Sequence, residues 1–138
     1  MAKIPEEVIE ALADKNSVKM MATVDKEKKV NLVPIGSVRV LDEERLAYAC
    51  CFNGKTKSNL ETTKRAAVAI FKPPMDGYQV KGMFVKWETS GELYEQMNQA
   101  LSATFKKLGV EGKVDAVGII KVTEAYALSL PIAGEKLA

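Results

Sequence analysis

The chain has 138 residues and an ordinary balance of apolar and charged side chains, so we expect one globular domain spanning residues 1–138. Its 20 basic and 18 acidic residues are interleaved and leave a net charge of +2, which argues against nucleic acid as a partner. No apolar run has the length of a membrane span, and the N-terminus does not resemble a signal peptide. We therefore expect a cytoplasmic protein with no membrane partner.

Histidine is absent from the chain, which excludes several kinds of active site. Catalytic triads with histidine, paired-histidine zinc sites and haem held by a proximal histidine all need the missing imidazole. The only cysteines, Cys50 and Cys51, are adjacent and cannot form a disulfide framework. The sequence predicts no metal site and no catalytic side chain, so a cofactor is the favoured source of any chemistry.

The first half of the chain predicts a helix followed by three strands. Residues 5–15 begin with proline and repeat apolar side chains every four residues, which is typical of an amphipathic helix. Strands are predicted over 17–24, 30–40 and 46–52, the first two forming a hairpin. Pro34 and Gly36 make the middle of the second strand irregular, because proline has no N–H to donate and glycine often marks a bulge.

The second half predicts two helices and three strands. A helix over 55–64 precedes a short apolar strand over 66–71 and a long strand over 78–90, with a bend at Gly82. The next helix, over 92–108, is amphipathic, and Gly109 and Gly112 end it. Its apolar face comprises Leu93, Met97, Leu101, Phe105 and Leu108. A last strand is predicted over 116–130. Six mostly sequential strands with few helices indicate a mainly β fold, an antiparallel barrel.

Residues 46–60 carry the strongest functional signal. An apolar strand ends in an Asn-Gly turn, and the first turn of the following helix carries Lys55, Thr56 and Lys57. A helix N-terminus attracts phosphate through its free N–H groups and its dipole, and the apolar strand offers a wall for a flat ring. Ala49 stands where a P-loop would need glycine, so that motif is excluded. The alternative that these lysines are merely solvated stays open.

Three stretches, 31–37, 53–60 and 78–82, together resemble the FMN-binding split β-barrel proteins related to pyridoxamine 5′-phosphate oxidase. The resemblance covers roughly residues 16–129 and is greatest to the minimal FMN-binding members of the family. It implies a six-stranded antiparallel split β-barrel that forms a homodimer with FMN bound at the interface. The whole chain would then be a single FMN-binding split-barrel domain.

The resemblance also implies which residues bind the cofactor. The ring would rest on Val33, Pro34, Ile35, Gly36 and Ser37 and on Ala49, Cys50, Cys51 and Phe52, the phosphate would be held by Lys55, Thr56, Ser58 and Asn59, and Gln79 and Lys81 would reach the phosphate or the ring edge. Irregular backbone at residues 34–36 would free N–H groups for the polar edge of the ring. The alternative that Pro34 and Gly36 only bend the strand stays open.

The residues around the expected ring allow one further prediction. Cys50 and Cys51 are neighbours in a strand, so they face opposite sides, one the core and the other the cofactor.

The implied function is that of a redox flavoprotein. It would be a flavin reductase, an electron carrier or an oxidoreductase of unknown substrate, with a pyridine nucleotide or an electron-transfer protein as its partner. Two alternatives stay open: a deazaflavin-dependent oxidoreductase with the same fold, and a non-enzymatic flavin-binding or interaction module.

Overall fold

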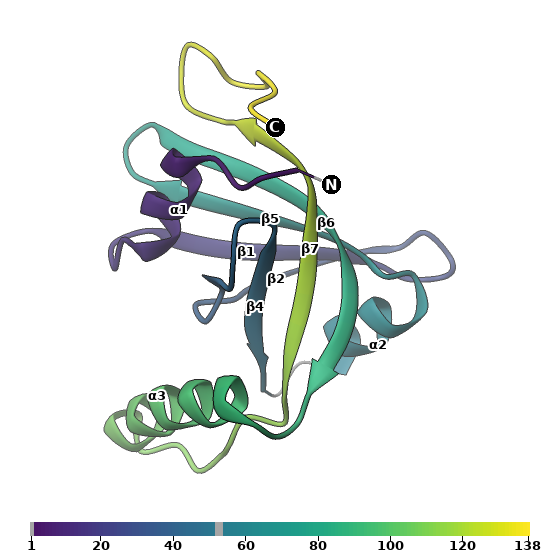
Figure 1. Ribbon diagram of the computed structural model, residues 1–138, viewed down its shortest axis with the longest axis vertical. Helices are drawn as coiled ribbons and strands as arrows, with labels where there is room; N and C mark the ends of the chain where they lie inside the picture. Colours follow the sequence, from purple (N-terminus) through teal and green to yellow (C-terminus); the bar gives the residue numbers. More distant parts are fainter. Residues whose placement is uncertain (1, 52–53) are drawn as a thin grey trace.

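The computed structural model describes residues 2–51 and 54–138, and within them it is mainly β (Figure 1). Seven antiparallel strands form one sheet: β1 (Val18–Val24), β2 (Val30–Pro34), β3 (Arg39–Val40), β4 (Arg45–Cys50), β5 (Arg65–Lys72), β6 (Asp76–Glu88) and β7 (Ala116–Ala127). The described helices are α1 (Glu6–Ala13), α2 (Gly54–Thr62) and α3 (Glu92–Leu108). None of these helices is long and apolar enough to cross a membrane.

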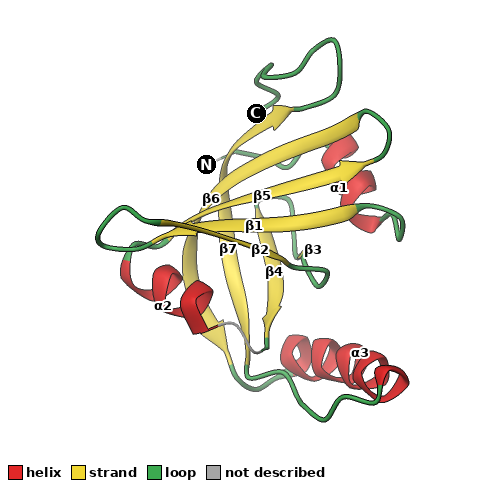
Figure 2. Ribbon diagram, turned by 180° about the vertical axis from the view of Figure 1, so that it is seen from behind, coloured by secondary structure: helices red, strands yellow, loops and turns green. Residues whose placement is uncertain are grey.

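The sheet has the strand order β2-β1-β5-β6-β7-β4-β3 and is strongly curled (Figure 2). Its concave side holds one core, to which both ends of the sheet contribute: Met21 comes from β1, Val68 from β5, and Leu46 and Tyr48 from β4. Strands from opposite ends can share a core only if the sheet curls round to bring them together. The arrangement is that of an open antiparallel barrel, consistent with the split barrel expected from the sequence.

The predicted strand over residues 30–40 is wrong as a single strand, and six strands become seven for this reason. The chain leaves β2 after Pro34 and joins β3 at Arg39. β2 pairs with β1, whereas β3 pairs with β4 at the other end of the sheet. The expected irregularity at Pro34 and Gly36 is therefore a complete strand break over residues 35–38. The other predicted elements agree with the structure to within three residues at each end.

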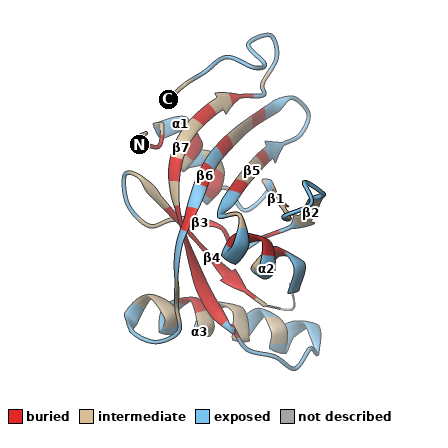
Figure 3. Cartoon of the chain, turned by 90° about the vertical axis from the view of Figure 1, so that its right-hand side faces the viewer, coloured by how far each residue is buried: buried red, intermediate tan, exposed pale blue. Residues whose placement is uncertain are grey.

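Strand β4 separates the barrel core from a second, smaller core. Successive side chains of a strand face opposite sides, so Leu46, Tyr48 and Cys50 lie in the barrel core while Ala47 and Ala49 face outward. The outward pair packs with Met97 of α3 and with residues of β7. Buried residues accordingly fill β4 and the adjoining part of β7 (Figure 3). Helix α3 thus covers the outside of the barrel at these two strands.

Helix α2 is fastened to β1 and β2 by buried polar side chains. Asn59 donates from Nδ2 to the Thr23 hydroxyl at 3.0 Å, and Thr56 accepts from Asn31 Nδ2 at 3.2 Å. Thr63, just after the helix, donates to the carbonyl of Val24 at 2.8 Å. These bonds cross between elements distant in sequence and fix where the N-terminus of α2 lies.

Two glycines allow close packing inside the sheet. A Cβ at Gly118 would lie 2.6 Å from the Tyr48 ring and 2.9 Å from the Trp87 ring. A Cβ at Gly82 would lie 2.5 Å from the carbonyl oxygen of Lys121, at the point where the β6–β7 pairing shifts register. The position at which the sequence predicts a bend, Gly82, coincides with this shift in register.

We predict that Gly82→Ala lowers the free energy of unfolding by about 1–3 kcal/mol, because the new methyl group collides with backbone that cannot move aside freely. Denaturant unfolding followed by circular dichroism measures the change. Gly54→Ala is the control, since a Cβ there meets nothing within 4 Å. Equal stability of the two variants would contradict the close approach.

We predict that Asn59→Ala lowers the free energy of unfolding by about 1–3 kcal/mol, because it leaves the Thr23 hydroxyl buried without its partner. The matched control is Ser58→Ala, whose side chain is exposed on the same helix and which we expect to change stability by less than about 0.5 kcal/mol. Urea midpoints of both variants make the comparison, and similar losses would argue against a special role for Asn59.

Candidate functional site

A groove of about 560 Å³ opens where the strand break, the outer face of β4 and the second half of α3 meet. Its lining comprises Val33, Pro34, Ile35, Gly36, Ser37, Ala49, Cys51, Leu101, Thr104 and Phe105. The first seven of these are residues that the sequence resemblance implies for the ring of a flavin. None of the described lining residues carries a charge, so the groove suits a flat, largely apolar ligand.

The strand break contributes unpaired backbone to the groove. The Ile35 amide still donates to the carbonyl of Lys19 at 2.9 Å, which continues the β1–β2 pairing by one residue. The amides of Gly36 and Ser37 find no acceptor among the residues that the structure describes. Free amides beside an apolar wall are the donors that a ring with polar edges needs.

Ser37 links the strand break to the wall of the groove that β4 forms. Its Oγ accepts a hydrogen bond from the Ala49 amide at 3.0 Å and donates to the Ala49 carbonyl at 3.4 Å. The walls formed by the strand break and by β4 are therefore joined through the Ser37 side chain.

Cys50, the last residue of β4, and Cys51, which follows it, face opposite sides, as the strand period predicts. Cys50 lies in the barrel core at 2 % exposure, so its side chain does not line the groove, whereas Cys51 does. Burial raises the pKa of the Cys51 thiol to about 11, and burial also raises the pKa of Cys50. Both thiols are protonated at neutral pH, so Cys51 offers the groove a neutral, polarisable wall and not a nucleophile.

The residues expected at the phosphate divide into two pairs on α2. Lys55 and Ser58 are exposed, while Thr56 and Asn59 are buried at 1 % and 7 % exposure and bonded to the barrel. The structure thus places Thr56 and Asn59 where they fix the helix. Phe52 lies outside the described residues.

The start of α2 is close to the groove along the chain. Three Cα–Cα steps of about 3.8 Å separate Cys51 from Gly54, so the helix begins within about 11 Å of the Cys51 Cα. The exposed side chain of Lys55 follows directly.

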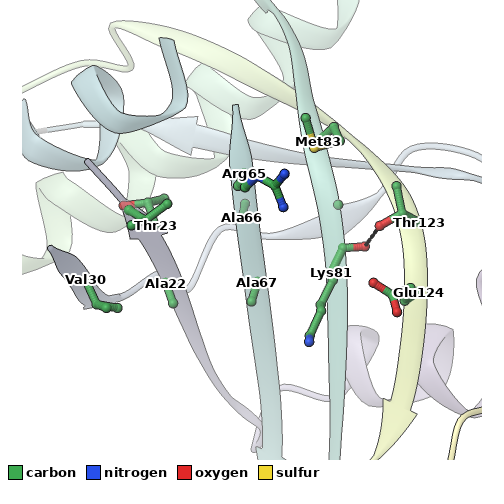
Figure 4. Close-up of a pocket in the computed structure, with 12 residues that line it drawn as sticks. Ala22, Thr23, Val30, Arg65, Ala66, Ala67, Lys81, Met83, Thr123 and Glu124 are labelled. Atoms are coloured by element: carbon green, nitrogen blue, oxygen red, sulfur yellow. Dashed lines mark hydrogen bonds between the residues drawn. The ribbon is translucent and has the colours of Figure 1, made fainter. Parts of the chain in front are cut away.

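Gln79 and Lys81 lie elsewhere on the chain, on the convex face of the sheet. β1 and β5 separate β6 from β2 in the strand order. Lys81 lines a shallow groove of about 270 Å³ on that face, together with Arg65 and Glu124 (Figure 4). Within one copy of the chain, these two predicted residues do not join the groove beneath α3.

Sequence reasoning missed the wall contributed by α3. Leu101 and Phe105 were predicted only as part of the apolar face of the helix; both remain half-buried and line the groove, and Leu108 is 69 % exposed. The available signal in the sequence was the length of the apolar face, which continues along the whole helix to Leu108.

Comparisons with known proteins support the assignment of the fold as an open antiparallel barrel. A search of curated proteins found no match. Among solved structures, HupZ from Group A Streptococcus is 26% identical with a TM-score of 0.77, over 98% of this chain and 99% of that one. An FMN-binding protein from Syntrophomonas wolfei is 19% identical with a TM-score of 0.74, over 90% and 88% of the two chains. An F420 reductase is 13% identical with a TM-score of 0.63, over 88% and 98%.

The family comparison covers most of the sequence. The model of the family described as pyridoxamine 5′-phosphate oxidase matches residues 4–127, which contain every described helix and strand. Together with the open antiparallel barrel, this match establishes the family: the chain belongs to the pyridoxamine 5′-phosphate oxidase family of split-barrel proteins.

Proposed function

We propose that this protein is a single-domain flavoprotein that binds FMN in the groove beneath α3 and has a redox role. One observation carries the proposal: the strand break and the end of β4, separated along the sequence, bring seven residues expected at the ring into one groove with no charged side chain in its described lining. The family match and the fold shared with an FMN-binding protein support a flavin as the ligand.

The groove fits the ring by shape and by chemistry. Val33 of β2, Ala49 of β4, and Leu101 and Phe105 of α3 offer apolar walls for a flat ring. The amides of Gly36 and Ser37, which lack acceptors in the described part of the chain, would meet the polar edge of the ring. Donors at that edge stabilise negative charge on the ring and so favour its reduction.

The phosphate would lie at the start of α2. Lys55 and Ser58 are exposed there, and the helix dipole and free N–H groups attract an anion. Thr56 and Asn59 act indirectly, because their bonds to Asn31 and Thr23 hold the helix in place. The path from the groove to this point is short enough for a ribityl chain.

When bound, FMN would supply the electron or hydride transfer, for which this chain has no group of its own. The residues of the groove bind and orient the ring and exclude water from one side of it. With no charged side chain in its described lining, the groove leaves proton transfer to solvent or to the redox partner.

We further propose that the protein is a homodimer whose interface includes the convex face of the sheet. The pairing register places Val18, Val30, Leu32, Phe71 and Met83 on this face, and each is between 38% and 78% exposed. An apolar face of this kind commonly marks an association surface. Gln79 and Lys81 lie on the same face, so a second copy would bring them to the site that they cannot reach in their own chain.

The absorbance spectrum of freshly purified protein, with mass spectrometry of any released ligand, tests the proposal. Oxidised-flavin bands and the mass of FMN are the expected result. A released deazaflavin would favour the second candidate, which the fold shared with an F420 reductase supports. A colourless protein that binds no added FMN would overturn the assignment.

We predict that Lys55→Ala weakens FMN binding by about 1.5–3 kcal/mol, the range for a hydrogen bond to a charged group. Quenching of flavin fluorescence gives the dissociation constants. Lys26→Ala is the control, since that exposed lysine lies in the β1–β2 turn. An unchanged constant for Lys55→Ala would remove the phosphate from the start of α2.

We predict that Leu32→Asp halves the mass measured by light scattering, because a carboxylate would be buried within the interface. FMN affinity should fall with it, as each site would lose the residues of the other copy. Leu130→Asp is the matched control: it is 66 % exposed, against 61 % for Leu32, and lies beyond the end of β7. A Leu32→Asp protein of unchanged mass would place the interface elsewhere.

A further inference from the structure

Ser37 occupies a special position relative to β4. The β3–β4 register pairs Arg39 with Ala47 and Val40 with Leu46, so its continuation would set Ser37 directly opposite Ala49. The backbone has already separated from β4 at this point, and the strand pairing stops. The Ser37 hydroxyl takes the place of the missing backbone partner by bonding both the amide and the carbonyl of Ala49.

This substitution sets the spacing between the two walls of the groove. A side-chain hydroxyl reaches farther than a backbone group, so the strand break stays apart from β4 and yet remains fastened to it. Gly36, Ser37 and Ala49 all line the groove, and the amides of Gly36 and Ser37 remain without acceptors in the described chain. Loss of the hydroxyl would let the break either close onto Ala49 or move away from it.

We propose that Ser37 is a positioning residue for the flavin, which sets the groove width and the placement of the free amides through its bonds to Ala49. This inference rests on the proposed function, since it concerns how the same groove holds its ring. Ser37 would act through Ala49, so loss of the Ser37 hydroxyl would alter both the affinity for the flavin and the redox potential of the bound flavin.

The chain contains a matched control for this role. Ser129 Oγ accepts a hydrogen bond from the Gly77 amide at 2.9 Å and donates to the Gly77 carbonyl at 3.2 Å. The two bonds repeat those of Ser37 on Ala49. Ser129 lies just beyond the end of β7. Figure 1 shows this end of β7, near the C-terminus, at the opposite end of the molecule from α3.

The experiment compares Ser37→Ala, Ser37→Thr and Ser129→Ala with the wild type. Three quantities are measured: the FMN dissociation constant, the midpoint potential of the bound flavin and the hydrogen-exchange rate of the Ala49 amide without flavin. We expect Ser37→Ala to raise the dissociation constant at least tenfold, to shift the potential and to speed exchange at Ala49. Ser37→Thr should restore most of each value, and Ser129→Ala should leave all three within twofold.

The outcomes separate this inference from the proposed function. A wild-type protein that binds no FMN overturns both. A wild type that binds FMN, with Ser37→Ala matching it in affinity and potential, overturns the positioning role alone. Should Ser37→Ala fail to fold, Ser37→Cys carries the same comparison, because the thiol keeps the size and a weaker hydrogen-bonding group.

Discussion

The short link between β2 and β3 is the constraint on which the rest of the structure depends. These strands lie at opposite ends of a seven-stranded sheet. In a flat sheet, six spacings of about 4.8 Å would set them about 29 Å apart. Five Cα–Cα steps from Pro34 to Arg39 reach at most about 19 Å, since each step is about 3.8 Å. The sheet must therefore curl until its ends approach, and the barrel follows from this link.

The curl also determines what each face of β4 does. Leu46, Tyr48 and Cys50 are enclosed, and the small side chains of Ala47 and Ala49 are left outside. Alanine lets α3 approach the strand closely, while the link passes beside the same strand and supplies the other wall. The groove is thus the space left between a helix on the outside of the barrel and a chain segment that has left one strand and not yet joined the next.

Local sequence patterns were sufficient to predict the helices and strands, but they did not reveal which strands pair with each other. Helix 92–108 and the opposite faces of Cys50 and Cys51 follow from periods that neighbouring residues reveal. The irregularity at Pro34 and Gly36 was equally visible, but its consequence depends on pairing with β1 and β4, which is set by the whole sheet. The burial of Thr56 could have been predicted from the sequence. Thr56 lies four residues before the buried Leu60, on the same side of the helix, and that side faces the barrel.

Gln79 connects the proposed interface to the proposed site. It lies on the convex face between Ala69 and Tyr126 of the neighbouring strands, and its side-chain amide makes no hydrogen bond within the described chain. Lys81 differs from Gln79 because it already has an electrostatic partner. Its charge helps to lower the pKa of Glu124, although the hydrogen bond from the Tyr126 hydroxyl has the larger effect. A second copy covering this face would bury the Gln79 amide, at a cost unless it finds a partner. The polar edge of a ring held in the other copy's groove would provide one, so dimerisation and flavin binding would stabilise each other.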